Sequence, residues 1–236
     1  MVSYVFKRYE NKYILTPEQY ETILREVEKR MDPDEFGETT IQSLYYDTPT
    51  CLLIRNSILK PKYKEKIRVR SYGLATPDSK VYLELKRKSK GIVYKRRISL
   101  KETKCNDFFE KGESLGTDQI SREIDYFKNF YGTLRPLILI LYDRIAFKKK
   151  EIDLRITFDR NTRYRSTRLS LCDGLDGIHL LEPGHVLMEI KSSLGFPMWL
   201  TKLLSEHKVY KRSFSKVGEA YKRELTLSRQ EAKKIV

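Results

Sequence analysis

Segments in the middle of the chain alternate cationic and apolar side chains, and this pattern constrains the fold more than any other feature. In the run 66–70 (KIRVR), cations stand at every second position with Ile and Val between them. Since side chains at i and i+2 share one face of a β-strand, one face of this strand is cationic and the other apolar. Related alternation recurs at 81–88 and 186–191. The pattern predicts a sheet with one strongly charged face.

The excess of positive charge makes such a face electrostatically unfavourable. The chain has 236 residues with 47 Lys and Arg against 32 Asp and Glu, a net charge of +15. A charged face turned to water explains any single strand, and a solvated basic surface is the plain alternative for the whole protein. Seven strands share the habit, however, and like charges on neighbouring strands repel. We therefore expect a closed antiparallel β-barrel with helices outside and a cationic lumen that holds a polyanion such as a triphosphate or a longer phosphate chain.

Turn and capping signals divide the rest of the chain into an α+β order of elements. Thr16-Pro17 followed by Gln19, for instance, is a typical start of a helix. The predicted strands are 5–15, 40–46, 64–72, 80–88, 92–100, 135–148, 151–159, 162–171 and 184–192. The predicted helices are 17–31, 50–59, two pieces within 103–131, 199–207 and 215–223, followed by a fraying polar tail. No linker interrupts the chain, which predicts one domain over 1–236.

The cysteines and the apolar runs indicate a cytoplasmic protein. Cys51, Cys105 and Cys172 are odd in number and widely spaced, which argues against a disulfide scaffold or a zinc ribbon. The first residues carry charge where a signal peptide needs an apolar stretch. The longest strongly apolar run, 137–142, is too short to cross a membrane.

An ordered set of short motifs resembles a known family. The set is Arg8-x-Glu10-x-Lys12-Tyr13, Lys66-x-Arg68-x-Arg70, Glu84-x-Lys86, Tyr142-Asp143-Arg144-x-Ala146-Phe147, Glu189-x-Lys191 and Ser213-Phe214-Ser215-Lys216. It is similar to the VTC-type polyphosphate polymerase domain, a member of the triphosphate tunnel metalloenzymes, in the family's order from about Phe6 to Tyr221. The resemblance implies a tunnel-shaped antiparallel barrel, in agreement with the alternation.

The resemblance also implies roles for individual residues. The implied catalytic cations are Arg68, Arg70, Lys86, Arg144, Arg155 and Lys216. The implied substrate-binding residues are Lys12, Lys95, Arg97, Tyr142 and Ser215. Glu189 resembles the family's ligand for Mn²⁺ or Mg²⁺, with Glu10 assisting. Ser215 and Lys216 are expected at a helix start, where free backbone N–H groups and the helix dipole favour a phosphate.

Each of these residues also has an ordinary structural interpretation, which the sequence leaves open. The lysines can be surface residues, and Arg68 and Arg144 can be partners of Glu84 and Asp143 in ion pairs. Tyr142 can be a core residue, and Ser215 only a helix cap. If repulsion dominates the lumen, Arg68→Ala abolishes activity while leaving thermal stability intact or raised.

The departure from the family pattern at Arg8 favours one reaction over another. Hydrolases of the superfamily carry a glutamate at this position, so Arg8 replaces a carboxylate with a cation. This favours a polyphosphate polymerase, which transfers the γ-phosphoryl group of ATP to phosphate or a growing polyphosphate chain. The alternatives are a triphosphatase and a non-catalytic polyanion-binding module. The implied partners are ATP, phosphate and polyphosphate, with no nucleic acid expected and a membrane-protein partner left open.

Overall fold

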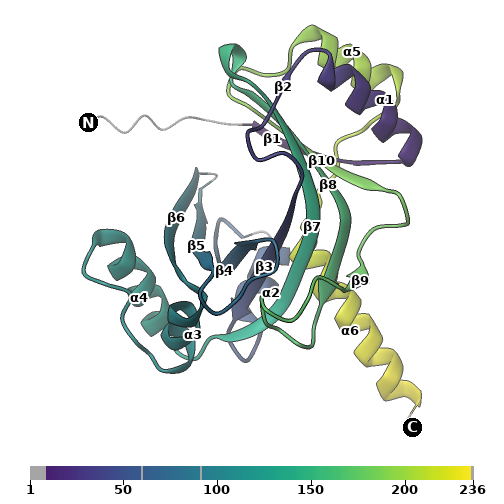
Figure 1. Cartoon of the computed structure of the whole chain (residues 1–236). Coiled ribbons are helices and arrows are strands. Elements are labelled where there is room, and N and C mark those ends of the chain that lie inside the picture. The colour runs from purple at the N-terminus through teal and green to yellow at the C-terminus, as the bar shows by residue number, and fades with distance from the viewer. Residues whose placement is uncertain (1–8, 60, 91, 235–236) are drawn as a thin grey trace. The chain divides into compact units, whose positions relative to one another are not determined.

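The computed structural model describes residues 9–59, 61–90 and 92–234 (Figure 1). Its strands are β1 (Tyr9–Leu15), β2 (Asp32–Pro33), β3 (Thr39–Asp47), β4 (Tyr63–Tyr72), β5 (Lys80–Ser89), β6 (Ile92–Lys101), β7 (Arg135–Lys149), β8 (Leu154–Arg165), β9 (Ile178–His179) and β10 (Val186–Ser192). Its helices are α1 (Pro17–Glu28), α2 (Leu52–Leu59), α3 (Glu102–Glu110), α4 (Gln119–Tyr131), α5 (Met198–Glu206) and α6 (Lys216–Lys234), with a 3₁₀ turn at Lys150–Ile152. Arg8, whose cation is expected to favour a polymerase, lies outside the described residues.

Most of the predicted elements are confirmed. The start of α1, for example, is fixed by the capping signal at Thr16. Its side chain accepts a hydrogen bond from the Gln19 backbone while the Gln19 side chain accepts one from the Thr16 backbone. Two predictions are wrong. In place of the strands expected at 151–159 and 162–171 there is one strand, β8 (Leu154–Arg165), which continues through Asn161 although its φ is +47°, and residues 166–171 are not in a strand. The tail expected to fray after Leu225 remains helical to Lys234, because strong helix formers such as Glu, Lys and Ala continue beyond it.

The strands form one antiparallel sheet in the hydrogen-bonded order β1-β10-β8-β7-β3-β4-β5-β6, to which β2 and β9 are added at the side. This order does not return to its beginning, so among the described residues the expected closed barrel is not formed. The prediction failed on this point because an open curved sheet and a barrel have the same alternation of side chains. Closure depends on strand tilt and stagger, which the pattern does not encode.

The chain forms two compact units that alternate along the sequence. Unit 1 comprises Met1–Thr40, Tyr142–Thr162 and His179–Phe214, and unit 2 comprises Ile41–Leu141, Arg163–Ile178 and Ser215–Val236. Four of the five boundaries fall inside β3, β7, β8 and β9, and the fifth, between Phe214 and Ser215, lies in the loop between α5 and α6. The prediction of one domain over 1–236 stays a prediction.

Unit 1 has its own core between strands and a pair of helices. Ile23 and Val27 of α1 pack with Leu200 and Leu204 of α5, and these two helices lie side by side (Figure 1). Apolar side chains of β1, β8 and β10 complete the cluster. One face of these strands is therefore buried against helices, and their other side chains are left for other roles.

Unit 2 buries the apolar face of its charged strands. Ile67, Val69, Leu83 and Leu85 are almost fully buried in a core that includes residues of α3 and α4. These helices contact β5 and β6 (Figure 1). The cationic side chains at alternate positions of β4–β6 consequently share the opposite face, as the sequence predicts.

No helix in the described ranges combines the length and the apolar character that crossing a membrane requires. The cytoplasmic location stays a prediction.

Candidate functional site

Three lysines of unit 2 stand side by side across three strands. Lys66 of β4 pairs with Lys86 of β5, and Lys86 pairs with Lys95 of β6. Lys86 is exposed and forms no ion pair with any described residue. Like charges directly opposite each other destabilise a sheet, so this lysine row is costly without a counter-ion.

The neighbouring row is organised by a single carboxylate. Glu84 lies between Arg68 and Arg97 in the sheet register, and its side chain is 2% exposed. Arg68 Nη2 lies 2.8 Å from Glu84 Oε2, and Arg70 Nε lies 3.9 Å from the same oxygen. Lys95 Nζ is 2.7 Å and Arg97 Nε 3.6 Å from Glu84 Oε1. We call these five residues the Glu84 cluster.

The electrostatics of the Glu84 cluster follow from one anion among four cations. Burial raises the pKa of Glu84, but the charges of Arg68 and Arg70 outweigh burial and lower it to about 2. Burial also lowers the pKa of the Lys95 ammonium, which Glu84 offsets only in part. The cluster keeps an excess of positive charge and can accept an anion without losing its internal ion pairs.

Tyrosines hold the arginines at the margin of the cluster. The Arg97 guanidinium carbon lies 3.7 Å from the centre of the Tyr82 ring, and Arg97 Nη2 donates a hydrogen bond to Tyr72 Oη at 3.2 Å. On the other side, Arg68 Nη1 donates to Tyr45 Oη at 2.8 Å. These contacts orient the planar guanidinium groups and leave less freedom to be lost when an anion binds.

The start of α6 lies beside the lysine row. Lys66 Nζ donates to Ser215 Oγ at 3.3 Å, and Ser215 Oγ accepts from the Gly218 backbone N–H at 3.3 Å. The predicted helix start at Ser215 and Lys216 is confirmed, because α6 begins at Lys216. Ser215 therefore caps the helix, as the ordinary interpretation predicts, and it also contacts a lysine of the row.

Unit 1 carries a second set of charged side chains in register. Glu10, Lys191 and Arg155 form one row across β1, β10 and β8, and Lys12, Glu189 and Thr157 form the next. Lys12 Nζ lies 3.6 Å from both Glu10 and Glu189, and Lys191 Nζ lies 2.7 Å from Glu189. The two predicted metal-ligating carboxylates are thus joined through Lys12. Arg155 turns to Asp34 instead, with Nη2 2.7 Å from Oδ2.

Arg144 is held by a partner that the sequence did not suggest. Its Nε and Nη2 donate to the two oxygens of Asp159 at 2.5 and 2.8 Å, and Asp159 is fully buried. Tyr142 is also buried, with its ring centre 5.0 Å from the Arg144 guanidinium carbon. Burial lowers the pKa of Arg144, but Tyr142 and Asp159 outweigh it and raise that pKa. Arg144 therefore remains a cation with a fixed orientation.

Glu189 and Thr157 are the oxygen donors nearest to a candidate metal site in unit 1. Among the described residues, no three His, Cys, Asp or Glu side chains form a ready metal site. Thr157 stands opposite Glu189, and its hydroxyl is buried without a hydrogen-bond partner in the described part of the chain. Mg²⁺ typically binds one or two carboxylates together with phosphate oxygens and water. Glu189 supplies a carboxylate of this donor set, and the unsatisfied Thr157 hydroxyl adds a neutral oxygen beside it.

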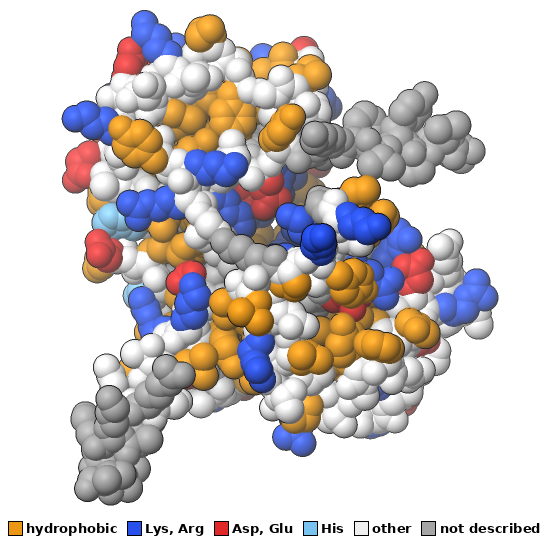
Figure 2. Space-filling view, turned by 180° about the vertical axis from the view of Figure 1, so that it is seen from behind, with side chains coloured by type: hydrophobic (Ala, Val, Ile, Leu, Met, Phe, Trp, Pro, Cys, Tyr) orange, Lys and Arg blue, Asp and Glu red, His pale blue; other side chains and the backbone are white. Residues whose placement is uncertain are grey.

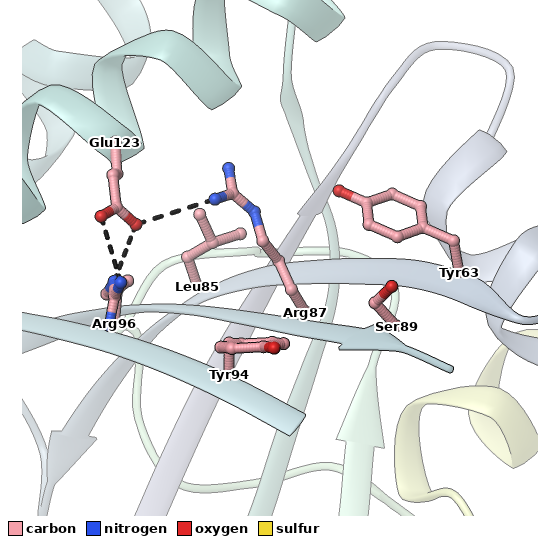
Figure 3. Close-up of a pocket in the computed structure, with 7 residues that line it drawn as sticks. All are labelled: Tyr63, Leu85, Arg87, Ser89, Tyr94, Arg96 and Glu123. Atoms are coloured by element: carbon pink, nitrogen blue, oxygen red, sulfur yellow. Dashed lines mark hydrogen bonds and ion pairs between the residues drawn. The ribbon is translucent and has the colours of Figure 1, made fainter. Parts of the chain in front are cut away.

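The opposite face of β4–β6 has a different character (Figure 3). There a pocket of about 300 Å³ is lined by Tyr63, Leu85, Arg87, Ser89, Tyr94, Arg96 and Glu123. Arg96 donates to both oxygens of Glu123 at 2.7 and 3.1 Å, and Arg87 Nη1 lies 3.7 Å from Glu123. These arginines join the sheet to α4.

Basic side chains are also prominent on the face seen in Figure 2, as the charge of +15 leads one to expect.

The structure brings the predicted site residues together in two sets. In unit 2 these are Arg68, Arg70, Lys86, Lys95, Arg97, Ser215 and Lys216. In unit 1 they are Glu10, Lys12, Tyr142, Arg144, Arg155 and Glu189. Sequence reasoning assigned no site role to Tyr45, Asp159 or Thr157, and it treated Glu84 only as a carboxylate set among cations and as an alternative ion-pair partner of Arg68. The alternation already placed Glu84 on the cationic face, and a lone carboxylate among cations was the available signal.

Together, the fold and these charged rows define an antiparallel-sheet protein with one cationic face. The model of the VTC domain family matches residues 7–224, so the chain belongs to the VTC domain family. No curated protein sequence matches it significantly.

Solved structures resemble the chain at low sequence identity. A candidate adenylate cyclase from Bacillus halodurans is 11% identical, with a TM-score of 0.54 and coverage of 87% of this chain and 92% of its own. HpAC1 from Hippeastrum, a candidate adenylyl cyclase described as having a dominant triphosphatase activity, is 14% identical with a TM-score of 0.55. The alignment covers 89% of this chain and 93% of HpAC1. The predicted α+β fold of the triphosphate tunnel type is confirmed, apart from the closure of its sheet.

Proposed function

We propose that this chain is a metal-dependent polyphosphate polymerase. It transfers the γ-phosphoryl group of ATP to phosphate or to the end of a polyphosphate chain and releases ADP. The observation that carries the proposal is the row Lys66–Lys86–Lys95 next to the Glu84 cluster. Closely spaced cations with a single carboxylate among them match the charge density of a phosphate chain better than that of an isolated anion. Membership of the VTC family supports the same reaction.

Phosphoryl transfer needs positioning and charge neutralisation more than covalent chemistry. The bond between the γ-phosphorus and the β–γ bridging oxygen breaks, and a terminal oxygen of the acceptor forms the new bond. That oxygen is already anionic, so no strong general base is required. We assign charge neutralisation to Arg68, Arg70, Lys86, Arg144, Arg155 and Lys216. We assign substrate binding to Lys12, Lys95, Arg97, Tyr142 and Ser215.

We assign Glu189, with Glu10 in support, to a Mn²⁺ or Mg²⁺ ion that accompanies the nucleotide. The ion would neutralise phosphate oxygens and so lower the barrier to attack by an anionic acceptor. Lys12 and Lys191 hold the Glu189 carboxylate in place at 3.6 and 2.7 Å. Thr157 offers a further neutral oxygen beside it.

The alternative is hydrolysis of tripolyphosphate or nucleoside triphosphates. The triphosphatase activity in the description of the Hippeastrum relative favours it. The link of Glu10 and Glu189 through Lys12 counts against it, because the ammonium group neutralises carboxylate charge that a site for two metal ions would need. Binding of a polyanion without catalysis is the remaining alternative.

The test is to incubate the purified protein with ATP and Mn²⁺ and to resolve ADP, free phosphate and long-chain polyphosphate. ADP with a polyphosphate ladder supports the polymerase. Free phosphate without a ladder supports the triphosphatase, and unchanged ATP supports a binding module. Lys86→Ala should remove most of the ladder. Arg122→Ala, which removes one exposed positive charge from α4 of the same unit, should leave the ladder unchanged.

A further inference from the structure

Tyr45 and Glu84 hold Arg68 from its two sides. Tyr45 of β3 pairs with Arg68 of β4, which pairs with Glu84 of β5. Arg68 Nη1 donates to Tyr45 Oη at 2.8 Å, while Nε donates to Glu84 Oε2 at 2.8 Å. The guanidinium carbon lies 5.6 Å from the centre of the Tyr45 ring. The phenol therefore shares one cation with the only carboxylate of the cluster.

Most of the charged side chains on the strands of unit 2 near Tyr45 are positive. They are Lys66, Arg68 and Arg70 on β4, Glu84 on β5, Lys95 and Arg97 on β6, and Lys216 at the start of α6. The part of β7 in this unit, 135–141, has Arg135 as its single titratable side chain. Asp47, two positions further along β3, accepts hydrogen bonds from the backbone N–H groups of Leu53 and Ile54. Cations thus greatly outnumber anions near the Tyr45 hydroxyl.

These cations change the acidity of the phenol. Burial raises the pKa of Tyr45, but the charges of Arg68, Lys66 and Arg70 outweigh burial and lower it from 10.0 to about 7. Near neutral pH the hydroxyl is therefore present both as phenol and as phenolate. In the phenolate form Tyr45 acts as a second counter-ion for Arg68, in addition to Glu84.

We propose that Tyr45 is a positioning residue of the anion site and that binding of a phosphate chain to the Glu84 cluster is coupled to uptake of a proton at Tyr45 Oη. An arriving phosphate chain replaces the phenolate as counter-ion of Arg68, Lys66 and Arg70. The phenolate oxygen then takes a proton from solvent and becomes a neutral phenol, which still accepts the hydrogen bond from Arg68. The proton returns to solvent when the chain leaves. This inference rests on the proposed phosphate-binding function but not on catalysis.

The test uses tripolyphosphate as the probe, without nucleotide or metal. The near-ultraviolet absorbance of phenolate is followed as a function of pH for the wild type and for Tyr45→Phe. We expect one ionisation step near neutral pH in the wild type, absent from Tyr45→Phe and shifted to higher pH by saturating tripolyphosphate. Calorimetry in two buffers of different ionisation enthalpy should show proton uptake on binding by the wild type and less uptake by Tyr45→Phe.

Affinity provides a second measurement. Above the ionisation of free Tyr45, tripolyphosphate binding by the wild type should weaken by up to about tenfold per pH unit more than binding by Tyr45→Phe. Protonation of tripolyphosphate itself acts equally on both proteins, so their difference isolates Tyr45. Tyr94→Phe is the matched control, because Tyr94 lies on the opposite face of β6 and lines the pocket there. It should retain the ionisation step.

The outcomes separate this inference from the proposed function. A neutral-pH step that persists in folded Tyr45→Phe, or that does not respond to tripolyphosphate, overturns the role of Tyr45. A coupled step in a protein that makes no polyphosphate supports the inference and contradicts the polymerase. Thermal unfolding of Tyr45→Phe shows whether the variant is folded. If Tyr45→Phe is unfolded, the wild type alone provides the test. Proton uptake in calorimetry together with loss of phenolate absorbance on binding supports the inference, and proton uptake without that loss overturns it.

Discussion

Arg68 and Glu84 form an ion pair across β4 and β5, with Nη2 2.8 Å from an oxygen of a carboxylate whose side chain is 2% exposed. This pair makes Arg68 a structural partner as well as a candidate catalytic residue. Repulsion among the cations led us to expect that Arg68→Ala leaves stability intact or raised. The contact indicates the opposite, because the variant takes from Glu84 one of its two partners within 3 Å.

We therefore expect Arg68→Ala to lose activity and also to lower the free energy of unfolding by about 1–3 kcal/mol. Arg70, Lys95 and Arg97 remain beside Glu84 and limit the loss. Denaturant unfolding and the polyphosphate assay measure the two effects. An inactive variant with unchanged stability would restore the expectation based on repulsion.

Glu84→Gln should destabilise the protein more than any loss of a single cation. It leaves four cations without their shared anion, and removing one partner of a buried ion pair costs roughly 3–5 kcal/mol. The pKa of Glu84 is lowered from 4.5 to about 2 on folding, so its contribution is complete above pH 4.5 and is lost as the pH falls toward 2. Urea titrations at neutral pH and within this acidic window should show the difference between wild type and variant shrinking. A constant difference would mean that Glu84 is not the charged centre of the cluster.

Lys86→Ala should separate binding from stability. Lys86 stands between Lys66 and Lys95, so its removal relieves repulsion and should leave stability unchanged or raise it by up to about 1 kcal/mol. Tripolyphosphate affinity should fall by about tenfold, the effect of losing roughly 1.4 kcal/mol of charge-assisted contact. Calorimetric titration measures the affinity, with Arg122→Ala as the charge-matched control. An equal loss of tripolyphosphate affinity in both variants would mean that only the net charge of the protein matters and that Lys86 does not contact the phosphate chain.

Thr157→Val tests the proposed metal site in unit 1. The Thr157 hydroxyl is buried without a hydrogen-bond partner among the described residues, so a methyl group in its place should not lower stability. If the hydroxyl binds the ion beside Glu189, the Mn²⁺ concentration for half-maximal activity should rise about tenfold. Metal titration of the activity gives the result. An unchanged Mn²⁺ requirement with unchanged stability would remove Thr157 from the site.

The sequence predicted the cationic face and offered Glu84 as an alternative partner of Arg68, but it did not fix the register of the strands. Alternation at 66–70 is a local property, so the face follows from it directly. The position of Glu84 between Arg68 and Arg97 depends on the registers of β4 with β5 and of β5 with β6. A slip of one residue in either hairpin would turn every side chain of a strand to the other face. The turn residues alone do not determine the register of these hairpins.

The partner of Arg144 shows the same limit. Asp143 is its neighbour in sequence and was the natural candidate for an ion pair. Adjacent residues of a strand point to opposite faces, and Asp143 accepts a hydrogen bond from Thr40 at 2.8 Å instead. Asp159, on β8, is the residue that Arg144 meets. Long-range partners of this kind require the strand order, which a single sequence does not reveal.

The interleaving of the two units has a consequence for dissection of the chain. Because each unit is assembled from three separate segments, with boundaries inside β3, β7, β8 and β9, no single cut yields an intact half. A cut at any of the four boundaries that lie in strands divides a strand between the two units. Gene fragments and domain swaps that divide these strands should therefore fail to fold.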